Sequence, residues 1–201
     1  MGLVVEGHGE VAAVPILIRR ILSDLGAYDV QVLHPHRVPR SKLGKGEWGR
    51  AIRLQFAKAL ESGPDGACVV AIMDADDDDP EAIVRMVFDE VAHLADGQVD
   101  VVVAVKEYEA WFLASLESIR GHSAVRGDAE FLGDPEQPRN AKKALEEQMT
   151  QSYSETLHQA SFSQLIDLEA CSARSPSFAE LVTSLASRFG RGAIPPTRTK
   201  A

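Results

Sequence analysis

The chain has 201 residues, 45% of them hydrophobic, which suffices for one compact domain with a sizeable core. Its 30 acidic and 21 basic residues give a net charge of −9, which argues against tight binding of nucleic acid by the isolated chain. No apolar run reaches membrane-spanning length and the N-terminus lacks a signal peptide pattern, so we expect a cytoplasmic protein without membrane contact. Cys68 and Cys171 fall in predicted core elements and indicate no disulfide framework.

The first predicted element is a short apolar strand at residues 3–6, which leads into the sequence Glu6-Gly7-His8-Gly9-Glu10. Apolar residues then recur at helical spacing from Val11 to Leu25 and predict a helix. Glu6 therefore follows a strand directly, and Glu10 falls in the first helical turn. The two glycines between them allow a sharp turn and a close approach to a ligand. A second strand is predicted at residues 30–34.

A basic segment follows between residues 36 and 53, where six arginines and lysines accompany a single acid, Glu47. We predict a phosphate-contacting loop here, with Trp48 as a surface for base stacking. The competing interpretation is a solvated loop that precedes a helix at residues 49–60, with Trp48 packed against the core. The candidate substrate-binding residues of this segment are Arg37, Arg40, Lys42 and Lys45.

The most informative feature is the run of seven apolar residues at 67–73, which leads directly into Asp74 and Asp76. Such a run is typical of a parallel strand buried on both faces, and loops at the carboxyl ends of these strands hold ligands. Neighbouring carboxylates repel one another, and a divalent cation such as Mg²⁺ or Mn²⁺ offsets that repulsion. We interpret residues 77–79 as solvated or capping acids, with Asp79 as the N-cap of a helix that starts at Pro80.

A further apolar run at residues 99–105 leads into Glu107, Glu109 and Trp111. The alternation of strands and helices predicts an α/β fold, with one mainly parallel sheet flanked by helices. Because the carboxyl ends of parallel strands share one edge, the acids after the three strands are expected to meet there. Strands are predicted near residues 3–6, 30–34, 68–73 and 99–105.

The rest of the chain predicts an irregular segment and a helical extension at residues 119–201, packed on an α/β core of residues 1–118 as one domain. Lys142 and Lys143 open a short helix, where they are either solvated or in contact with a phosphate. Ser177 and Glu180 form a capping-box pattern at the start of the last helix. Arg174, just before that helix, is a further candidate for binding an anion.

Four motifs resemble a bacterial family called domain of unknown function 4276: Val5-Glu6-Gly7, Asp74-Ala75-Asp76, Glu109-Ala110-Trp111 and the segment 174–178. A glutamate after the first strand and a later Asp-x-Asp pair also resemble Toprim domains. The Glu6-x-x-x-Glu10 spacing resembles the overcoming-lysogenization-defect nucleases. The resemblance implies a Toprim-like, Rossmann-like core with a helical extension. It also implies a general acid or base role for Glu6, and it favours Glu109 over Glu107.

These expectations combine into a metal-dependent phosphoryl-transfer protein, most simply a nuclease that acts on DNA or RNA. One or two Mg²⁺ or Mn²⁺ ions would be held by Glu6, Glu10, Asp74, Asp76 and Glu109. The resemblance to the overcoming-lysogenization-defect nucleases implies a partner ATPase and a role in phage defence. Two alternatives stay open: a nucleotide-sugar transferase whose Asp-x-Asp pair binds a diphosphate, and a non-catalytic effector subunit that binds metal or nucleotide.

Overall fold

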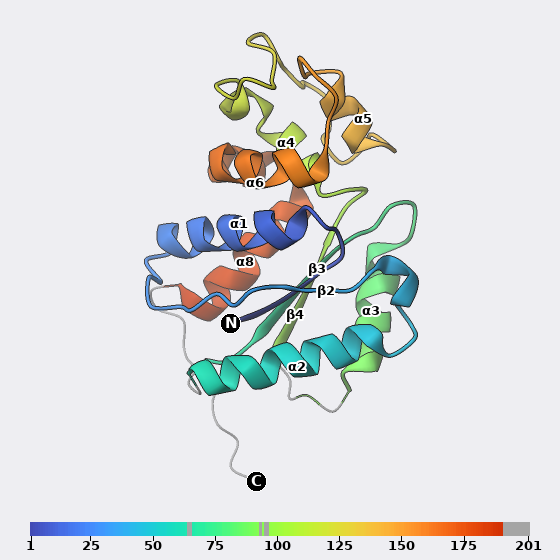
Figure 1. The fold of residues 1–201 in the computed structure, drawn as a ribbon, viewed down its shortest axis with the longest axis vertical. Helices are drawn as coiled ribbons and strands as arrows, with labels where there is room; N and C mark the ends of the chain where they lie inside the picture. Colours follow the sequence, from blue (N-terminus) through green and yellow to red (C-terminus); the bar gives the residue numbers. More distant parts are fainter. Residues whose placement is uncertain (64–65, 93, 95–96, 191–201) are drawn as a thin grey trace.

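The computed structural model describes residues 1–63, 66–92, 94 and 97–190. Its centre is a four-stranded, entirely parallel sheet in the order β2-β1-β3-β4 (Figure 1). The strands are β1 (Gly2–Val5), β2 (His36–Arg37), β3 (Val69–Asp74) and β4 (Val99–Ala104). Helices flank the sheet, so the predicted α/β class is confirmed, and the arrangement is consistent with a Rossmann-like or Toprim-like fold.

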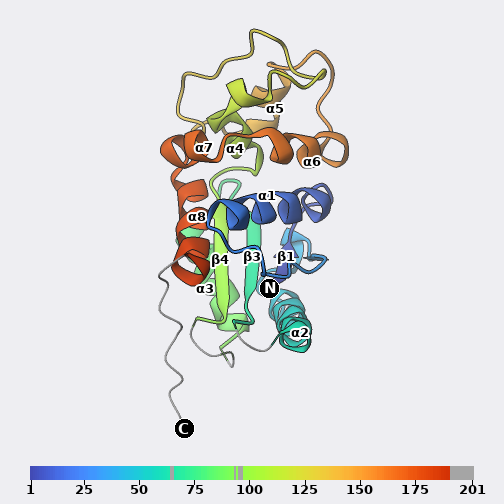
Figure 2. The ribbon, with the colours of Figure 1, turned by 90° about the vertical axis from the view of Figure 1, so that its left-hand side faces the viewer.

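The helices form layers on both sides of this sheet. They are α1 (Glu10–Asp24), α2 (Glu47–Ser62), α3 (Pro80–Glu90), α4 (Glu109–Ala114), α5 (Ala141–Glu146), α6 (Glu155–Leu165), α7 (Leu168–Arg174) and α8 (Pro176–Phe189), with short 3-10 turns η1 (Arg40–Lys42) and η2 (Leu116–Ile119). Helices α1 and α8 lie on one side of the sheet, and α2 and α3 lie on the other (Figures 1 and 2). Helices α4 to α7 form a further layer beyond α1, with α6 packed on α1.

Strands β1, β3 and β4 are buried on both faces, as their apolar runs predicted, whereas β2 is only partly buried. Leu3 and Ile72 belong to the core cluster on the α1 side, whereas Val4, Ala71 and Met73 belong to the cluster on the α2 side. This alternation follows from the two-residue period of a β-strand, which sends successive side chains to opposite faces. A strand covered on both faces has its backbone fixed along its whole length, so the residue at its end is held in a defined place.

The prediction of a strand at residues 30–34 is wrong. The segment runs beside β1, with the Leu33 N–H donating to the Met1 carbonyl at 3.0 Å, but ladder pairing occurs only at His36 and Arg37. Pro35 explains the difference, because it has no N–H to contribute to a continuous ladder. The second strand is therefore short and lies at the edge of the sheet.

Two predicted helix starts have different outcomes. Asp79 caps α3 as expected, since its side chain accepts from the Glu81 N–H at 3.1 Å. The prediction of a capping box that starts at Ser177 is wrong. The N-cap of α8 is Ser175, whose hydroxyl accepts from the Phe178 N–H at 3.2 Å. Pro176 takes the first helical position, where its fixed φ is favourable, and so moves the helix start two residues earlier.

Helix α8 packs on β4 and α1, and α6 packs on α1. The core cluster on the α1 side contains Leu17 together with Phe162 and Leu181, and it thus spans the proposed boundary at residue 118. That boundary stays a prediction. Among the described residues, no helix combines the length and apolar character needed to cross a membrane.

Candidate functional site

Two acids meet at the carboxyl ends of neighbouring strands. Strand β1 ends at Val5 and delivers Glu6, and β3, its parallel neighbour, ends at Asp74. The backbone N–H of Asp74 lies 3.4 Å from Oε2 of Glu6. The expectation that these two acids share one edge of the sheet is therefore met by the structure.

The turn after β1 brings a third acid to the same place. Glu10 begins α1, is 2% exposed, and its Oε2 accepts from the Glu6 N–H at 3.1 Å. A Cβ at position 7 would lie 2.7 Å from Oε1 of Glu10, and one at position 9 would lie 2.6 Å from the Glu155 carbonyl oxygen. Gly7 therefore leaves room for the Glu10 carboxylate, and Gly9 leaves room for α6 to approach.

Glu109 is the fourth acid, and it begins α4. Its side chain is 0% exposed. Its Oε1 accepts from the Tyr153 hydroxyl at 2.7 Å and from the Gln159 side-chain amide at 2.8 Å. Its Oε2 is buried and makes no hydrogen bond within the described part of the chain. Such an unsatisfied buried oxygen is rare and calls for an explanation, such as a bound ion or a functional role.

Asp74 and Asp76 differ in their surroundings. Asp74 is 9% exposed, and its Oδ1 accepts from the Tyr108 N–H at 2.8 Å. Asp76 is exposed and has a φ of 50°, and its N–H donates at 2.8 Å to the carbonyl of Lys106, whose φ is 67°. Left-handed conformations are uncommon for residues other than glycine and tend to cluster at functional sites.

The acids raise one another's pKa. Burial raises the pKa of Asp74 well above its usual value, and the charges of Glu10, Glu109 and Glu6 raise it further. Burial likewise raises the pKa of Glu10 to about 8, and it raises the pKa of Glu6 and of Glu109. The raised pKa values show that several ionised carboxylates are unfavourable side by side in this place, and a bound cation would favour their ionised forms.

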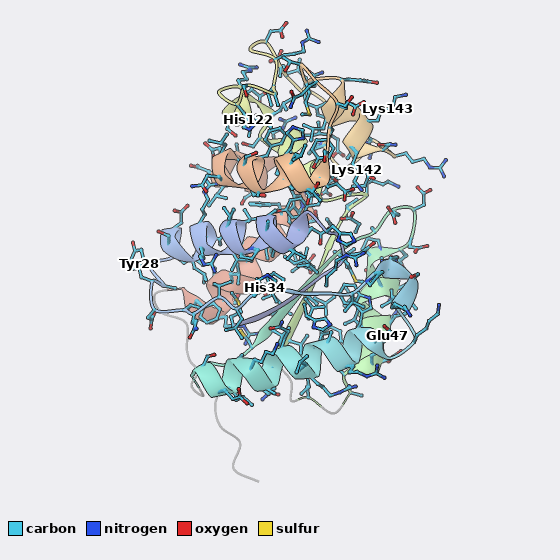
Figure 3. All side chains as sticks on the ribbon, viewed as in Figure 1. Tyr28, His34, Glu47, His122, Lys142 and Lys143 are labelled. Atoms are coloured by element: carbon cyan, nitrogen blue, oxygen red, sulfur yellow. The ribbon has the colours of Figure 1, made fainter. Side chains whose placement is uncertain are left out.

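Basic side chains reach the same place from two directions. Arg40 donates to the Asp74 carbonyl at 2.9 Å and pairs with Asp78 at 2.5 Å. Lys142, on α5 (Figure 3), pairs with Glu155 at 2.8 Å. Burial lowers the pKa of Lys142, but the surrounding acids, Glu109 foremost, outweigh this effect and leave the pKa raised.

These groups line a pocket of about 200 Å³, called the acidic pocket below. Its lining residues are Glu6, Gly7, His8, Glu10, Arg37, Pro39, Arg40, Asp74, Lys142, Glu155 and Gln159. The structure thus brings together Glu6, Glu10 and Asp74 from the predicted metal ligands, and Arg37 and Arg40 from the predicted substrate-binding residues. Glu109 lies behind the pocket, where it contacts Gln159. Asp76 is close enough to raise the pKa of Glu6.

Other residues singled out in the sequence lie elsewhere. Lys42 pairs with Glu47 at 2.9 Å, and Lys45 donates to the Ser41 carbonyl at 2.7 Å. Of the two interpretations of Trp48, the one that packs it against the core is confirmed and the stacking surface is excluded, because its side chain is 0% exposed between α2 and the sheet.

Arg174 is engaged in structural contacts. Its guanidinium donates to the carbonyls of Ala114 and Gly133 at 3.1 and 2.9 Å and also to that of Phe131. Arg174 thereby ties the end of α4 to the irregular segment that follows it. Its predicted role in binding an anion stays a prediction.

Tyr153 and Gln159 were missed from the sequence. Both come from the helical extension and hold Glu109 from more than 40 residues away. No local pattern marks either residue, because only the packing of α6 on α1 brings them to the site. Lys142 carried a weak signal as a basic residue at a helix start.

The residues suit a divalent metal ion in their chemistry. All the donors are carboxylate oxygens, which suit Mg²⁺ or Mn²⁺, and the orphaned Oε2 of Glu109 shows that the cluster is not satisfied by protein donors alone. In the part of the chain that the structure describes, no three Asp, Glu, His or Cys side chains are grouped to hold one ion. The oxygens of Glu10 and Glu109 are instead turned toward N–H and O–H donors of the protein.

Comparison with known proteins gives one match. The family model described as "Domain of unknown function (DUF4276)" matches residues 5–186, which include every acid of the site. No curated protein and no solved structure shows significant similarity to the chain.

Proposed function

Because the chain belongs to the DUF4276 family, whose description gives no activity, we propose a function from the chemistry of the acidic pocket. We propose a divalent-metal-dependent phosphoryl-transfer enzyme, a nuclease of Toprim type that cleaves DNA or RNA. The observation that carries the proposal is the meeting of Glu6 and Asp74 at adjacent strand ends, with Arg37, Arg40 and Lys142 around the same pocket.

Each group has a role in this proposal. Glu6, Asp74 and Asp76 would hold Mg²⁺ or Mn²⁺, with Glu10 as a further ligand. When bound, the ion would neutralise charge on the scissile phosphate and lower the pKa of a water molecule. Glu109 would act from behind the pocket, through its charge and its contact with Gln159.

The protein's own residues would bind the phosphate and move the proton. Arg37 and Arg40 line the pocket beside the acids, where guanidinium groups suit the oxygens of a phosphodiester. Glu6 has a raised pKa because it is partly buried, which makes it a stronger base than an exposed glutamate. It would accept the proton of the attacking water as the new P–O bond forms and the bond to the leaving oxygen breaks.

The charge of the chain bears on its partners. With a net charge of −9, the isolated protein is expected to bind nucleic acid weakly and only at low salt. A partner protein with a basic surface would strengthen the binding of nucleic acid. The resemblance to the overcoming-lysogenization-defect nucleases suggests that this partner is an ATPase. A cytoplasmic role in phage defence is part of the same proposal.

A second candidate is favoured by the way the protein holds two of its acids. Because Glu10 and Glu109 already accept hydrogen bonds from the protein, the pocket also suits a non-catalytic subunit that binds a metal ion or a nucleotide. The two candidates use the same acidic pocket and differ only in whether the protein cleaves the molecule that it binds.

A cleavage assay separates the two. The full chain is incubated with plasmid DNA and with RNA, in Mn²⁺, in Mg²⁺ and in EDTA. The nuclease proposal predicts metal-dependent cleavage that falls by about 100-fold or more in Glu6→Gln and Asp74→Asn. The matched control is Asp89→Asn, an exposed acid on α3.

Cleavage by Asp74→Asn at the wild-type rate would contradict the nuclease proposal. Binding of Mn²⁺ by the wild-type protein without any cleavage would support the non-catalytic candidate.

A further inference from the structure

The acidic pocket is not isolated on the surface. It adjoins a larger hollow of about 560 Å³ between α5 and the start of α6, with which it shares His8, Lys142 and Glu155. On its other side it adjoins a hollow of about 150 Å³ between β2 and α2, with which it shares Arg37 and Pro39. These are called the α5–α6 hollow and the β2–α2 hollow below.

Unpaired basic groups lie in both hollows. Lys143 in the α5–α6 hollow and Arg50 in the β2–α2 hollow are exposed, and neither side chain makes an ion pair with any residue that the structure describes. Nε of Arg37, where the β2–α2 hollow meets the acidic pocket, is buried and makes no hydrogen bond within the same described residues. These cations are therefore available to a ligand, unlike Lys42, which already pairs with Glu47 at 2.9 Å.

Within the described residues, the acids that line the α5–α6 hollow make their contacts with groups other than Lys143. Glu155 already pairs with Lys142 at 2.8 Å. Glu146 accepts from the backbone N–H of Tyr153 at 2.7 Å. The surface thus runs from Lys143, through the recessed acids of the pocket, to Arg37 and Arg50.

The two ends of this surface are well separated. Figure 3 shows Lys143 and Glu47, which line the two outer hollows, far apart, with Lys142 between them. A single nucleotide in the acidic pocket cannot touch both ends. A polymer with a phosphate at each nucleotide can, and this favours a chain over a monomer as the ligand.

We propose that the acidic pocket is the middle of a longer groove that takes an extended single-stranded nucleic acid. Phosphates on one side of the reacting one lie against Lys143, and phosphates on the other side lie against Arg37 and Arg50. This inference rests on the proposed function, because it assigns the substrate class and its path across the same site.

The acidic pocket is recessed, and this favours a single-stranded ligand over a duplex. Asp74 is 9% exposed and Glu10 is 2% exposed, so the reacting phosphate has to enter a pocket of about 200 Å³. A flexible strand can bend one phosphate inward while its neighbours keep their contacts. Duplex DNA is stiff, with a persistence length of about 150 base pairs, and cannot bend in this way without a large cost.

The test is a binding assay without metal, so that turnover does not intervene. Fluorescent single-stranded oligonucleotides of two to about sixteen nucleotides are titrated with the full chain in EDTA at low salt. Affinity is expected to rise with length and then level off. In Arg50→Gln and in Lys143→Gln the slope of log affinity against log salt is expected to fall by about 0.7 for the longer oligonucleotides.

The matched control is Lys58→Gln, which removes an exposed lysine of α2 that lines neither hollow and is expected to bind as the wild type does. Equal affinity for a dinucleotide and a long oligonucleotide would overturn the proposal. So would wild-type binding by the Arg50→Gln, Lys143→Gln double variant, or tighter binding of a duplex than of a single strand of the same length.

The outcome is independent of the cleavage assay. Length-dependent binding that needs both cations, without cleavage in any metal, would contradict the nuclease and leave the groove intact. Metal-dependent cleavage by the wild type, together with unchanged oligonucleotide binding by Arg50→Gln and Lys143→Gln, would contradict the groove and leave the nuclease proposal intact.

Discussion

The hydroxyl of Tyr153 donates a hydrogen bond to Oε1 of Glu109 at 2.7 Å, and so links the helical extension to a fully buried acid at the start of α4. Gln159 of α6 donates to the same oxygen at 2.8 Å. The extension therefore does more than cover the sheet, because it fixes the position of one of the four acids whose charges act on one another.

Tyr153→Phe tests the energetic value of this link. The substitution removes the donor, keeps the ring that stacks on His158, and leaves Glu109 with one hydrogen bond fewer. We expect the free energy of unfolding to fall by about 1–3 kcal/mol, the usual cost of depriving a buried acceptor of its partner. Urea denaturation measures this value. Tyr28→Phe, at a side chain that is 77% exposed, is the control, and an equal free energy of unfolding for both variants would contradict the account.

The stability of the metal-free protein should depend on pH in a particular direction. Burial raises the pKa of Glu10 from its ordinary value of 4.5 to about 8, and the pKa values of Glu6, Asp74 and Glu109 are raised too. The native state therefore binds more protons than the unfolded state, so the contribution of these acids is complete below their unfolded pKa values. It is lost as pH rises toward and through about 8.

We accordingly expect the thermal midpoint, measured in EDTA, to fall as the pH is raised from about 5 to about 8.5. The corresponding loss in the free energy of unfolding should be on the order of a few kcal/mol. The fall should be smaller in Glu10→Gln, which keeps an oxygen acceptor for the Glu6 N–H, and unchanged in Glu61→Gln, an exposed position on α2. A midpoint in the Glu10→Gln variant that falls as steeply as that of the wild type would count against the proposed crowding of charge.

Replacing Gly9, in the turn after β1, with a larger residue should destabilise the protein. In Gly9→Ala the new Cβ would meet the side-chain oxygen of Gln159 and lie 2.6 Å from the Glu155 carbonyl oxygen, so α6 has to shift away from α1. We expect a loss of about 1–3 kcal/mol in stability, as for other overpacked sites. Gly121→Ala, where no atom lies within 4 Å of the added Cβ, is the control. Equal melting temperatures for the two variants would show that the approach of α6 is looser than the structure indicates.

The basic residues of the predicted phosphate-binding segment should not contribute equally. Arg37 lines the acidic pocket and has a buried, unpaired Nε, whereas Lys45 donates to the Ser41 carbonyl at 2.7 Å. Arg37→Gln should therefore weaken the binding of a single-stranded oligonucleotide. It should also lower the slope of log affinity against log salt concentration by about 0.7, whereas Lys45→Gln should change neither the affinity nor the slope. Fluorescence anisotropy at several salt concentrations measures both, and an equal effect of the two substitutions would contradict the assignment.

Much of the fold could be predicted because it depends on local pattern. The apolar run before Asp74 predicted a strand buried on both faces, and β3 is such a strand. The order of elements then predicted a parallel sheet, which places Glu6 and Asp74 at one edge. The errors arose where a single residue changes the backbone: Pro35 interrupts a ladder, and Pro176 moves a helix start.

The site was predicted only in part, and for a physical reason. Glu6, Glu10, Asp74 and Glu109 each end or follow a strand or begin a helix, so chain order alone indicated where they would lie. The residues that hold Glu109 carry no such mark, since Tyr153 and Gln159 reach it only through the packing of α6 on α1. The burial of Trp48 was likewise a matter of tertiary packing, which the sequence left undecided between core and surface.

Calorimetric titration with Mn²⁺ tests the central claim, that the acids at the carboxyl edge of the sheet form a metal site. The account predicts that the wild-type chain and the Asp89→Asn control bind Mn²⁺ with the same affinity. It predicts that the Asp74→Asn, Asp76→Asn double variant loses this binding while it stays folded, and that its metal-free form is as stable as the wild type or more so, because repulsion is relieved. Unchanged Mn²⁺ affinity in the folded double variant would contradict the account.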